Sequence, residues 1–302
     1  MARSLRNPAD LVVRSRLREP VVFPHLTERL ALKLSSIVHY TARAHFGAWH
    51  RKLGAPDWKD PRGVFTPLVY IELTATDVPI DPGKPLRVHG ETFLTKTLDD
   101  AGAIRHLVRE GRHVVLAADG AIVAKARLLN AFTRYDPDPA RRRVTSLPPA
   151  LGLGDAPSRV GELPDLATLV PLDRGPDFVE TSPRAWHYGQ TDANRHVNGM
   201  EYLREMEDYV AGVFYAGGHD LARLYFARAR IVYRKPCFRG EGYRRLAWFR
   251  GEAPLVIAGA FVKADDPPHA RPAVAVELTV AQHDGARARP ETHVSGRSQT
   301  RA

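Results

Sequence analysis

The sequence is poor in cysteine and lacks long apolar runs. Its 302 residues include a single cysteine, Cys237, which excludes an internal disulfide framework and a multi-cysteine zinc site. No apolar stretch approaches the roughly 20 residues that a membrane-spanning helix requires. Residues 1–6 are basic, but no apolar segment follows them, so they do not read as a secretory signal. We therefore expect no membrane span, and the cytoplasm is the simplest compartment.

Acidic residues are outnumbered by basic ones. The formal net charge is +10, which suits an acidic partner such as nucleic acid, an anionic membrane or an acidic carrier protein. A solvated basic surface explains the same charge equally well, because net charge bears first on solubility. The sequence has no glycine-rich dinucleotide loop or phosphate loop, and the few aromatic residues near the basic run form no recognised nucleic-acid module. We therefore expect no nucleic-acid partner and no cofactor.

Two segments with helical periodicity stand among strand-like segments. In residues 27–53, apolar side chains recur every three or four residues, and Thr27 is a plausible N-cap. In residues 201–215, Leu203, Met206 and Val210 form one apolar stripe. Strand-like segments span 68–76, 86–98, 113–118, 121–135, 178–188, 224–233, 243–250, 255–262 and 273–280, and Asp119-Gly120 predicts a hairpin turn.

This order of elements predicts a two-fold repeat of architecture. The first repeat spans residues 1–140, and the second spans 177–284. Between them, residues 141–176 are rich in Pro, Gly and Arg, which is typical of a linker. Residues 285–302 are rich in Arg, Ser, Thr and Pro and are expected to form a disordered tail.

A polar stretch directly before the second helix carries candidate chemistry. Asp192, Asn194 and His196 alternate along it. A carboxylate can act as a general base or a nucleophile, and an imidazole can polarise water near neutral pH. The N-terminus of the following helix presents backbone N–H groups that can hold a developing oxyanion. Asp and Asn also favour turns, so a purely structural loop is the alternative.

Two motifs in the second repeat resemble those of a known family. Residues 192–203 resemble the D-x-N-x-H-V-N-N-x-x-Y-[IL] signature of the acyl-ACP thioesterases, which are double hot-dog enzymes of plants and bacteria. Residues 233–237 are similar to the Y-R-R-E-C segment of the same family. The resemblance implies an α+β fold, a tandem (double) hot-dog in which two long helices are each wrapped by an antiparallel β-sheet.

The resemblance also implies a substrate and roles for the site residues. Asp192, Asn194 and His196 are expected to be catalytic, while the first repeat shapes the acyl pocket. The substrate is expected to be a fatty or polyketide-type acyl thioester on acyl carrier protein or CoA. Oxyanion donors are expected at the start of the second helix, from Val197, Asn198 and Gly199, and Asn198 is also expected to cap that helix.

The sequence departs from the family pattern at two positions. Pro236 stands where the plant enzymes have a glutamate thought to assist the activation of water, and proline supplies no acid. One acid–base group is worth about 10²–10⁴ in rate. Gly199 replaces the second asparagine of the signature and allows a closer approach to the backbone. Hydrolysis is the first prediction. The alternatives are acyl transfer, dehydration or another tailoring step on a carrier-bound intermediate, and acyl binding without turnover.

Cys237 and a basic strand each admit two interpretations. Cys237 could be a nucleophile beside His196 and Asn194 if basic neighbours lowered the pKa of its thiol, or it could be a small buried residue.

The basic strand could bind the carrier or the CoA phosphate, or it could simply keep an exposed sheet face soluble. The residues of this basic face are Arg228, Arg230, Arg234 and Lys235.

We expect no metal site and consider a homodimer plausible. Asn is a poor metal ligand, and no third strong ligand accompanies Asp192 and His196. Exposed edges of hot-dog sheets often pair, which would join two copies of the chain.

Overall fold

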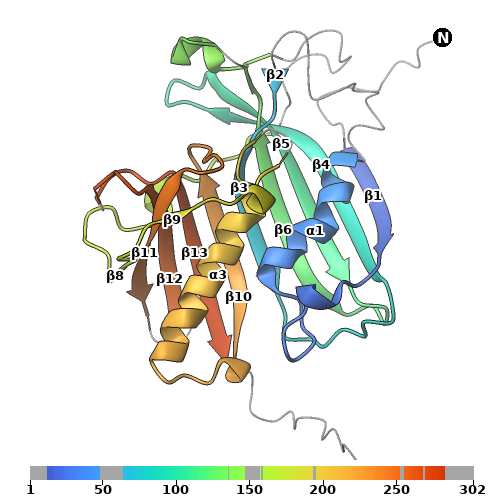
Figure 1. The fold of residues 1–302 in the computed structure, drawn as a ribbon. Helices are drawn as coiled ribbons and strands as arrows, with labels where there is room; N and C mark the ends of the chain where they lie inside the picture. The colour runs from blue at the N-terminus through green and yellow to red at the C-terminus, as the bar shows by residue number, and fades with distance from the viewer. Residues whose placement is uncertain are drawn as a thin grey trace, which may run out of the picture.

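The computed structural model describes residues 12–47, 64–134, 136–146, 157, 159–192, 195–251, 255–267 and 269–282. One continuous antiparallel sheet carries two helices on the same face, and each helix lies across one half of the sheet (Figure 1). This arrangement is the α+β double hot-dog that the sequence predicts.

The first half of the sheet is built from long strands, of which the last three in the chain follow one another through hairpins. Its elements are β1 (Val12–Glu19), α1 (Leu34–Ala42), β3 (Leu68–Ala75), β4 (Leu86–Leu98), β5 (Ile104–Leu116) and β6 (Ile122–Ala131). The expected Asp119-Gly120 turn joins β5 to β6, and Gly120 adopts a φ of 99°, which favours glycine. A separate small ladder pairs β2 (Val64–Phe65) with β7 (Thr133–Arg134).

The second half repeats this plan around a longer helix. Its elements are α3 (Gly199–Ala216), β10 (Leu224–Tyr233), β11 (Gly242–Arg250), β12 (Leu255–Lys263) and β13 (Val274–Gln282). The strand expected over 178–188 is instead two short strands, β8 (Phe178–Val179) and β9 (Arg184–Ala185), followed by a 3-10 turn, Tyr188–Gln190. Both short strands pair with β11. Other 3-10 turns are Phe23–His25, Pro139–Arg142, Leu166–Thr168 and Leu221–Arg223.

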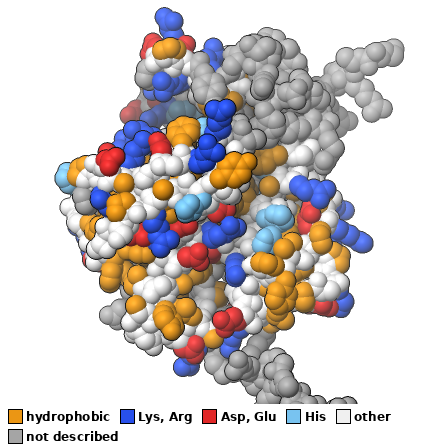
Figure 2. Space-filling view, in the orientation of Figure 1, with side chains coloured by type: hydrophobic (Ala, Val, Ile, Leu, Met, Phe, Trp, Pro, Cys, Tyr) orange, Lys and Arg blue, Asp and Glu red, His pale blue; other side chains and the backbone are white. Residues whose placement is uncertain are grey.

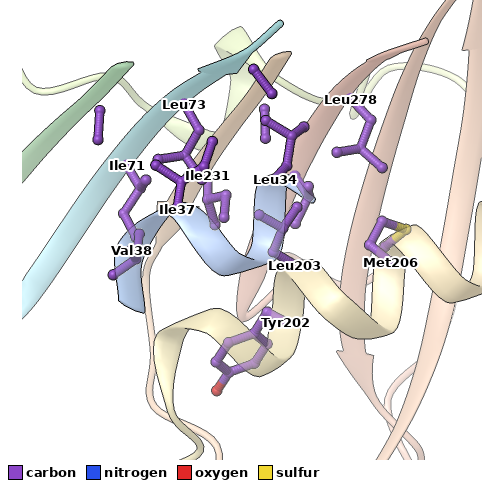
Figure 3. Packing of buried hydrophobic residues seen from close by; sticks show 14 of the residues in the cluster. Leu34, Ile37, Val38, Ile71, Leu73, Tyr202, Leu203, Met206, Ile231 and Leu278 are labelled. Atoms are coloured by element: carbon purple, nitrogen blue, oxygen red, sulfur yellow. The ribbon is translucent and has the colours of Figure 1, made fainter. Parts of the chain in front are cut away.

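The two halves join through an antiparallel pairing of β3 with β10, in which Ile71 lies opposite Ile231. The strand order is β1-β4-β5-β6-β3-β10-β13-β12-β11-β8. The two helices contact each other above this junction. Figure 3 shows Leu34 and Ile37 of α1 among Ile71, Leu73 and Ile231 of the sheet, with Leu203 of α3 beside them. One apolar core therefore runs under both helices.

The first helix begins later than the sequence predicts. The side chain of Thr27 accepts a hydrogen bond from the N–H of Ala31 in a turn, over 3.2 Å, and does not cap a helix. Leu30 has a φ of 62°, a left-handed conformation that a right-handed helix cannot contain. The helix starts after Lys33 and continues into a π-helical turn, Arg43–Gly47. The rest of the expected helix, to residue 53, lies outside the described residues.

Part of the expected linker packs on the opposite face of the sheet. Leu166, Leu169 and Val170 are buried there, and they form a second apolar cluster with Trp248 and Val232 of the sheet. The segment therefore helps to cover the sheet on the side that lacks helices. The expected repeat boundaries at residues 140 and 177 stay a prediction, and the expected tail lies outside the described residues.

Candidate active-site loop

The polar stretch before α3 is a tight hairpin. Thr191 and Val197 form an antiparallel bridge, and the N–H of Asp192 donates to the carbonyl oxygen of His196 over 2.8 Å. Arg195 adopts a φ of 64°, and its N–H donates to the carbonyl oxygen of Asp192 over 3.0 Å. A non-glycine residue in this left-handed region is uncommon and marks a constrained turn. The hairpin therefore sets the backbone of Asp192 beside that of His196.

The hairpin is held against the segment that follows β10. The N–H of Val197 donates to the carbonyl oxygen of Cys237 over 2.9 Å. His196 bridges Phe238, and their rings meet edge to face with centroids 5.1 Å apart. The N–H of Cys237 in turn donates to the hydroxyl of Tyr202 on α3, over 3.1 Å. The two segments that resemble the family motifs are thus in direct contact.

The helix begins where the hairpin ends. Asn198 occupies the N-cap, and its side-chain oxygen accepts from the N–H of Met200 over 3.0 Å. The hydroxyl of Tyr233 donates to the carbonyl oxygen of Gly199 over 2.8 Å. A β-carbon on Gly199 would lie 3.1 Å from that hydroxyl and 3.4 Å from Cδ2 of Leu68. Glycine at this position therefore permits close packing of β3 and β10 against the first turn of the helix.

Asp192 and His196, two of the three residues expected to be catalytic, lie on the two arms of this hairpin. Asp192 is exposed and His196 is half-buried. Asn194 lies outside the described residues. The bridge to Phe238 fixes the position of His196, and the bond to the His196 carbonyl oxygen fixes the backbone of Asp192. The catalytic roles of the three residues stay a prediction.

Cys237 lies in the core beneath the hairpin. It is 4% exposed, and burial raises the pKa of its thiol. A raised pKa keeps the thiol protonated, whereas a nucleophile must be a thiolate. This environment favours the packing interpretation of Cys237 over the nucleophile.

Gln190 supports the hairpin, although the sequence analysis did not single it out. Its carbonyl oxygen accepts from the N–H of Asn198 over 2.8 Å, and its side chain donates to Glu205 on α3 over 2.9 Å. Its side-chain oxygen also accepts from the N–H of His187 over 2.9 Å. In the sequence, the one local pattern that indicates this role is the H-x-x-Q spacing of His187 and Gln190, which is a weak form of the capping-box motif.

Two of the four residues of the basic face pair with carboxylates of neighbouring strands. Arg228 pairs with Glu72 of β3, and Arg230 binds Glu277 of β13 through two bonds of 2.7 Å each. Arg234 donates to the carbonyl oxygens of Pro272 and Arg271, over 2.6 and 2.7 Å. Lys235 is exposed. Arg228 and Arg230 therefore present less net charge to a carrier than the sequence indicates. On the face that Figure 2 shows, basic and acidic side chains are likewise interspersed.

Two further observations concern the described residues as a whole. None of their helices is both long enough and apolar enough to cross a membrane. No three His, Cys, Asp or Glu side chains among them gather into a group that could hold a metal ion.

Solved structures share this fold. No protein-family model matches the sequence, and no curated protein matches it. A protein described as an oleoyl thioesterase from Lactobacillus plantarum aligns with a TM-score of 0.65 at 14% identity, over 90% of this chain and 95% of that one. The 12:0-ACP thioesterase from Umbellularia californica aligns with a TM-score of 0.64 at 13% identity, over 90% and 95% of the two chains. An acyl-ACP thioesterase from Bacteroides thetaiotaomicron gives 0.60 at 11% identity, over 89% and 98%. The resemblance to acyl-ACP thioesterases is therefore confirmed at the level of the fold, over about nine-tenths of the chain.

Proposed function

We propose that this protein hydrolyses acyl thioesters carried by acyl carrier protein or CoA, and that the hairpin of Asp192 and His196 is its catalytic loop. The observation that carries the proposal is the contact of this hairpin with both the start of α3 and Cys237-Phe238. The contact joins a carboxylate, an imidazole and a helix N-terminus, which are the groups that thioester hydrolysis requires. The fold shared with solved thioesterases supports the same reading.

In the proposed reaction, the thioester carbonyl oxygen lies at the first turn of α3. The N–H groups of Val197 and Asn198, two of the expected donors, already bind the carbonyl oxygens of Cys237 and Gln190, and that of Met200 binds the Asn198 side chain. The N–H of Gly199 has no acceptor among the described residues and can donate to the developing oxyanion. Asp192 takes a proton from a water molecule, which His196 orients, and the water oxygen attacks the carbonyl carbon. The carbon–sulfur bond then breaks. The leaving thiolate takes up the proton that Asp192 received from the water, which restores the carboxylate, and the acyl group departs as a carboxylic acid.

A substitution at Asp192 tests the proposal. Asp192→Ala removes the general base, and we expect kcat for acyl-ACP or acyl-CoA hydrolysis to fall by about 10²–10⁴. The matched control is Asp173→Ala, because Asp173 is also exposed and has no side-chain hydrogen bond among the described residues. Intact-protein mass spectrometry of the carrier follows the loss of the acyl group. Full hydrolysis by the Asp192→Ala protein would remove this loop from the mechanism.

Pro236 favours a second candidate, a tailoring reaction on a carrier-bound acyl group. Pro236 is exposed and cannot supply the acid that the resembled family has at this position. The mass assay separates the two candidates. Free acid and bare carrier indicate hydrolysis, whereas a retained acyl group of changed mass indicates tailoring. No change of either kind indicates a binder.

The proposed carrier contact on the basic face can be tested at Lys235, which is exposed and lies beside Pro236. If this face binds the carrier, Lys235→Glu should raise KM for acyl carrier protein substrates and leave KM for a short synthetic thioester unchanged. Arg228→Gln should have a smaller effect, because Glu72 already neutralises that arginine. An equal KM for acyl carrier protein in the Lys235→Glu and unmodified proteins would place the carrier elsewhere.

A further inference from the structure

Arg109 is a buried cation in the first repeat that has no counterion among the described residues. It lies on the helix-facing side of β5, is 2% exposed, and stacks on the ring of Phe46 with a separation of 4.8 Å. Its Nε and Nη2 atoms have no hydrogen-bond partner in the described chain. Burial lowers the pKa of this guanidinium to about 10, which leaves it charged at neutral pH. An unpaired buried charge is costly, and the described residues supply no anion to balance it.

The two unpartnered nitrogens form the edge of the guanidinium that binds carboxylates elsewhere in this protein. Arg230 uses its Nε and Nη2 to hold both oxygens of Glu277, over 2.7 Å each. Arg245 uses the same edge for Glu180, and its Nε–Oε2 distance is 3.0 Å. This paired geometry matches a carboxylate, whose two oxygens accept in parallel. Arg109 presents that edge with no acceptor on it.

The polar side chains beside Arg109 are neutral, and none of them supplies an anion, although Nδ1 of His113 also lacks a partner among the described residues. The side chain of Asn130 donates to the carbonyl oxygen of Thr66 over 3.0 Å, which leaves its Oδ1 to accept from Nε2 of His45 over 2.7 Å. Nδ1 of His45 then lies 3.4 Å from Nε2 of His113. Burial lowers the pKa of both imidazoles, and the charge of Arg109 adds to the effect on His45. Arg109 is thus the one charge within this group of four.

The site lies in the same row of the sheet as the start of α3. Leu68 of β3 is opposite Asn130 of β6, and Asn130 is opposite Arg109 of β5. Neighbouring strands are about 4.8 Å apart, so Arg109 lies roughly 10 Å across the sheet from Leu68. Leu68 is the residue whose side chain packs against Gly199. Arg109 therefore lies on the helix-facing side of the first repeat, two strands away from the residue that packs against the proposed oxyanion site.

We propose that Arg109 binds a carboxylate at the far end of the acyl chain, so that the preferred substrates are thioesters of dicarboxylic acids. The inference rests on the proposed thioesterase function. A chain ending in a methyl group leaves the charge of Arg109 unpaired, and a chain ending in a hydroxyl group fills one N–H at most. A terminal carboxylate fills both N–H positions and balances the charge.

The test compares CoA thioesters matched in length that end in a methyl, a hydroxyl or a carboxyl group, over a series of chain lengths. At the fitting length, we expect the carboxyl-ended substrate to have a kcat/KM at least tenfold above that of the methyl-ended one. Arg109→Met keeps the approximate volume and removes the charge. This substitution should abolish the preference by lowering kcat/KM for the carboxyl-ended chain to that for the methyl-ended chain.

The control is Arg112→Met, which alters an arginine on the opposite face of the same strand whose side chain is 64% exposed. This variant should keep the preference. Equal rates on methyl-ended and carboxyl-ended chains, a preference for the hydroxyl-ended chain, or a carboxyl preference that survives Arg109→Met would each overturn the proposal.

A binding measurement separates this proposal from the proposed function. Free dicarboxylic acids should raise the melting temperature of the unmodified protein more than monocarboxylic acids of equal length or acetate do. Arg109→Lys, which keeps the charge but not the paired edge, should reduce the effect. An equal response to acetate would reveal a general anion site and overturn the chain-end assignment. Binding of the dicarboxylate with no hydrolysis of any thioester would contradict the proposed function while supporting Arg109 as the site.

Discussion

The hydroxyl of Tyr233 lies 2.8 Å from the carbonyl oxygen of Gly199 and donates a hydrogen bond to it. This bond ties the end of β10 to the first turn of α3, where the oxyanion is proposed to form. The same hydroxyl would lie 3.1 Å from a β-carbon on Gly199. The two residues are therefore fitted to each other, and substitutions at them should not act independently.

Tyr233→Phe should lower stability by about 0.5–1.5 kcal/mol through the lost hydrogen bond, and should lower kcat more than it changes KM. Urea denaturation and steady-state kinetics measure the two effects. Tyr215→Phe is the control, because Tyr215 is 75% exposed. Gly199→Ala should cost less in the Tyr233→Phe background than alone, because the nearest atom is then absent. Strict additivity in this double-mutant cycle would argue against the coupling.

Several elements could be read directly from the sequence. The bounds of β4 and β10 are as expected, because strand-favouring residues fill both segments and turn residues flank β4. β5 was expected only from residue 113 but begins at Ile104, because Arg105, Arg109 and Arg112 obscure the strand pattern. The start of α1 was missed because Leu30 continues the apolar stripe although its backbone is left-handed. The left-handed conformation is set by the turn and leaves no mark in the hydrophobic pattern.

The candidate site was predictable as a pair of motifs but not as a set of contacts. The sequence indicates a loop, a helix start and a later segment ending in Cys237. The bonds that join them depend on where the loop folds back onto the segment after β10.

The pairing of Arg228 with Glu72 could not be predicted from the sequence for a similar reason. It joins strands of different halves, and the register of β3 against β10 decides which side chains meet.

Two substitutions at Asn198 separate its role as the N-cap of α3 from the effect of charge at the helix N-terminus. Asn198→Ala removes the acceptor for the N–H of Met200 and should destabilise the protein by about 0.5–2 kcal/mol. Asn198→Asp keeps an acceptor there and should retain stability. The added negative charge lies at the proposed oxyanion site, however, so kcat should fall. Thermal unfolding and kinetics on both variants check this split. An Asn198→Asp protein with unchanged kcat would show that no negative charge develops at this end of the helix.

Two glycines of the first repeat make room for buried imidazoles. A β-carbon on Gly111 would lie 2.1 Å from Nδ1 of His45, and one on Gly90 would lie 2.2 Å from Nδ1 of His113. Gly111→Ala and Gly90→Ala should therefore each destabilise the protein by about 1–3 kcal/mol through overpacking.

Gly212 of α3 provides the contrast, because a β-carbon there meets nothing within 4 Å. Gly212→Ala should stabilise the protein by about 0.5–1 kcal/mol through helix propensity. Denaturant midpoints of the three variants test the signs. A neutral Gly111→Ala would mean that the His45 ring moves aside at little cost.

Glu207 should make the stability of the protein depend on pH. Its carboxyl lies between the two helices, is 7% exposed, and accepts from the N–H of Ser35 over 3.4 Å. Burial raises its pKa from 4.5 to about 7, against the bond from Ser35 and the charge of Lys33, which lower it. The folded state thus binds a proton that the unfolded chain has released. The stability that the protonated form contributes is complete below pH 4.5 and is lost as the pH rises through 7.

Since one pKa unit corresponds to about 1.4 kcal/mol, the loss across this window is on the order of 3 kcal/mol. Glu207→Gln keeps the shape and removes the titration, so its stability should vary less between pH 4.5 and 8 and should exceed that of the unmodified protein at pH 8. Urea midpoints measured across this range test the prediction. Glu28→Gln, at an exposed glutamate, should leave the pH dependence as it is. If the Glu207→Gln and unmodified proteins lose stability in parallel as the pH rises, the dependence arises from another group, and the buried carboxyl does not carry the proton assigned to it.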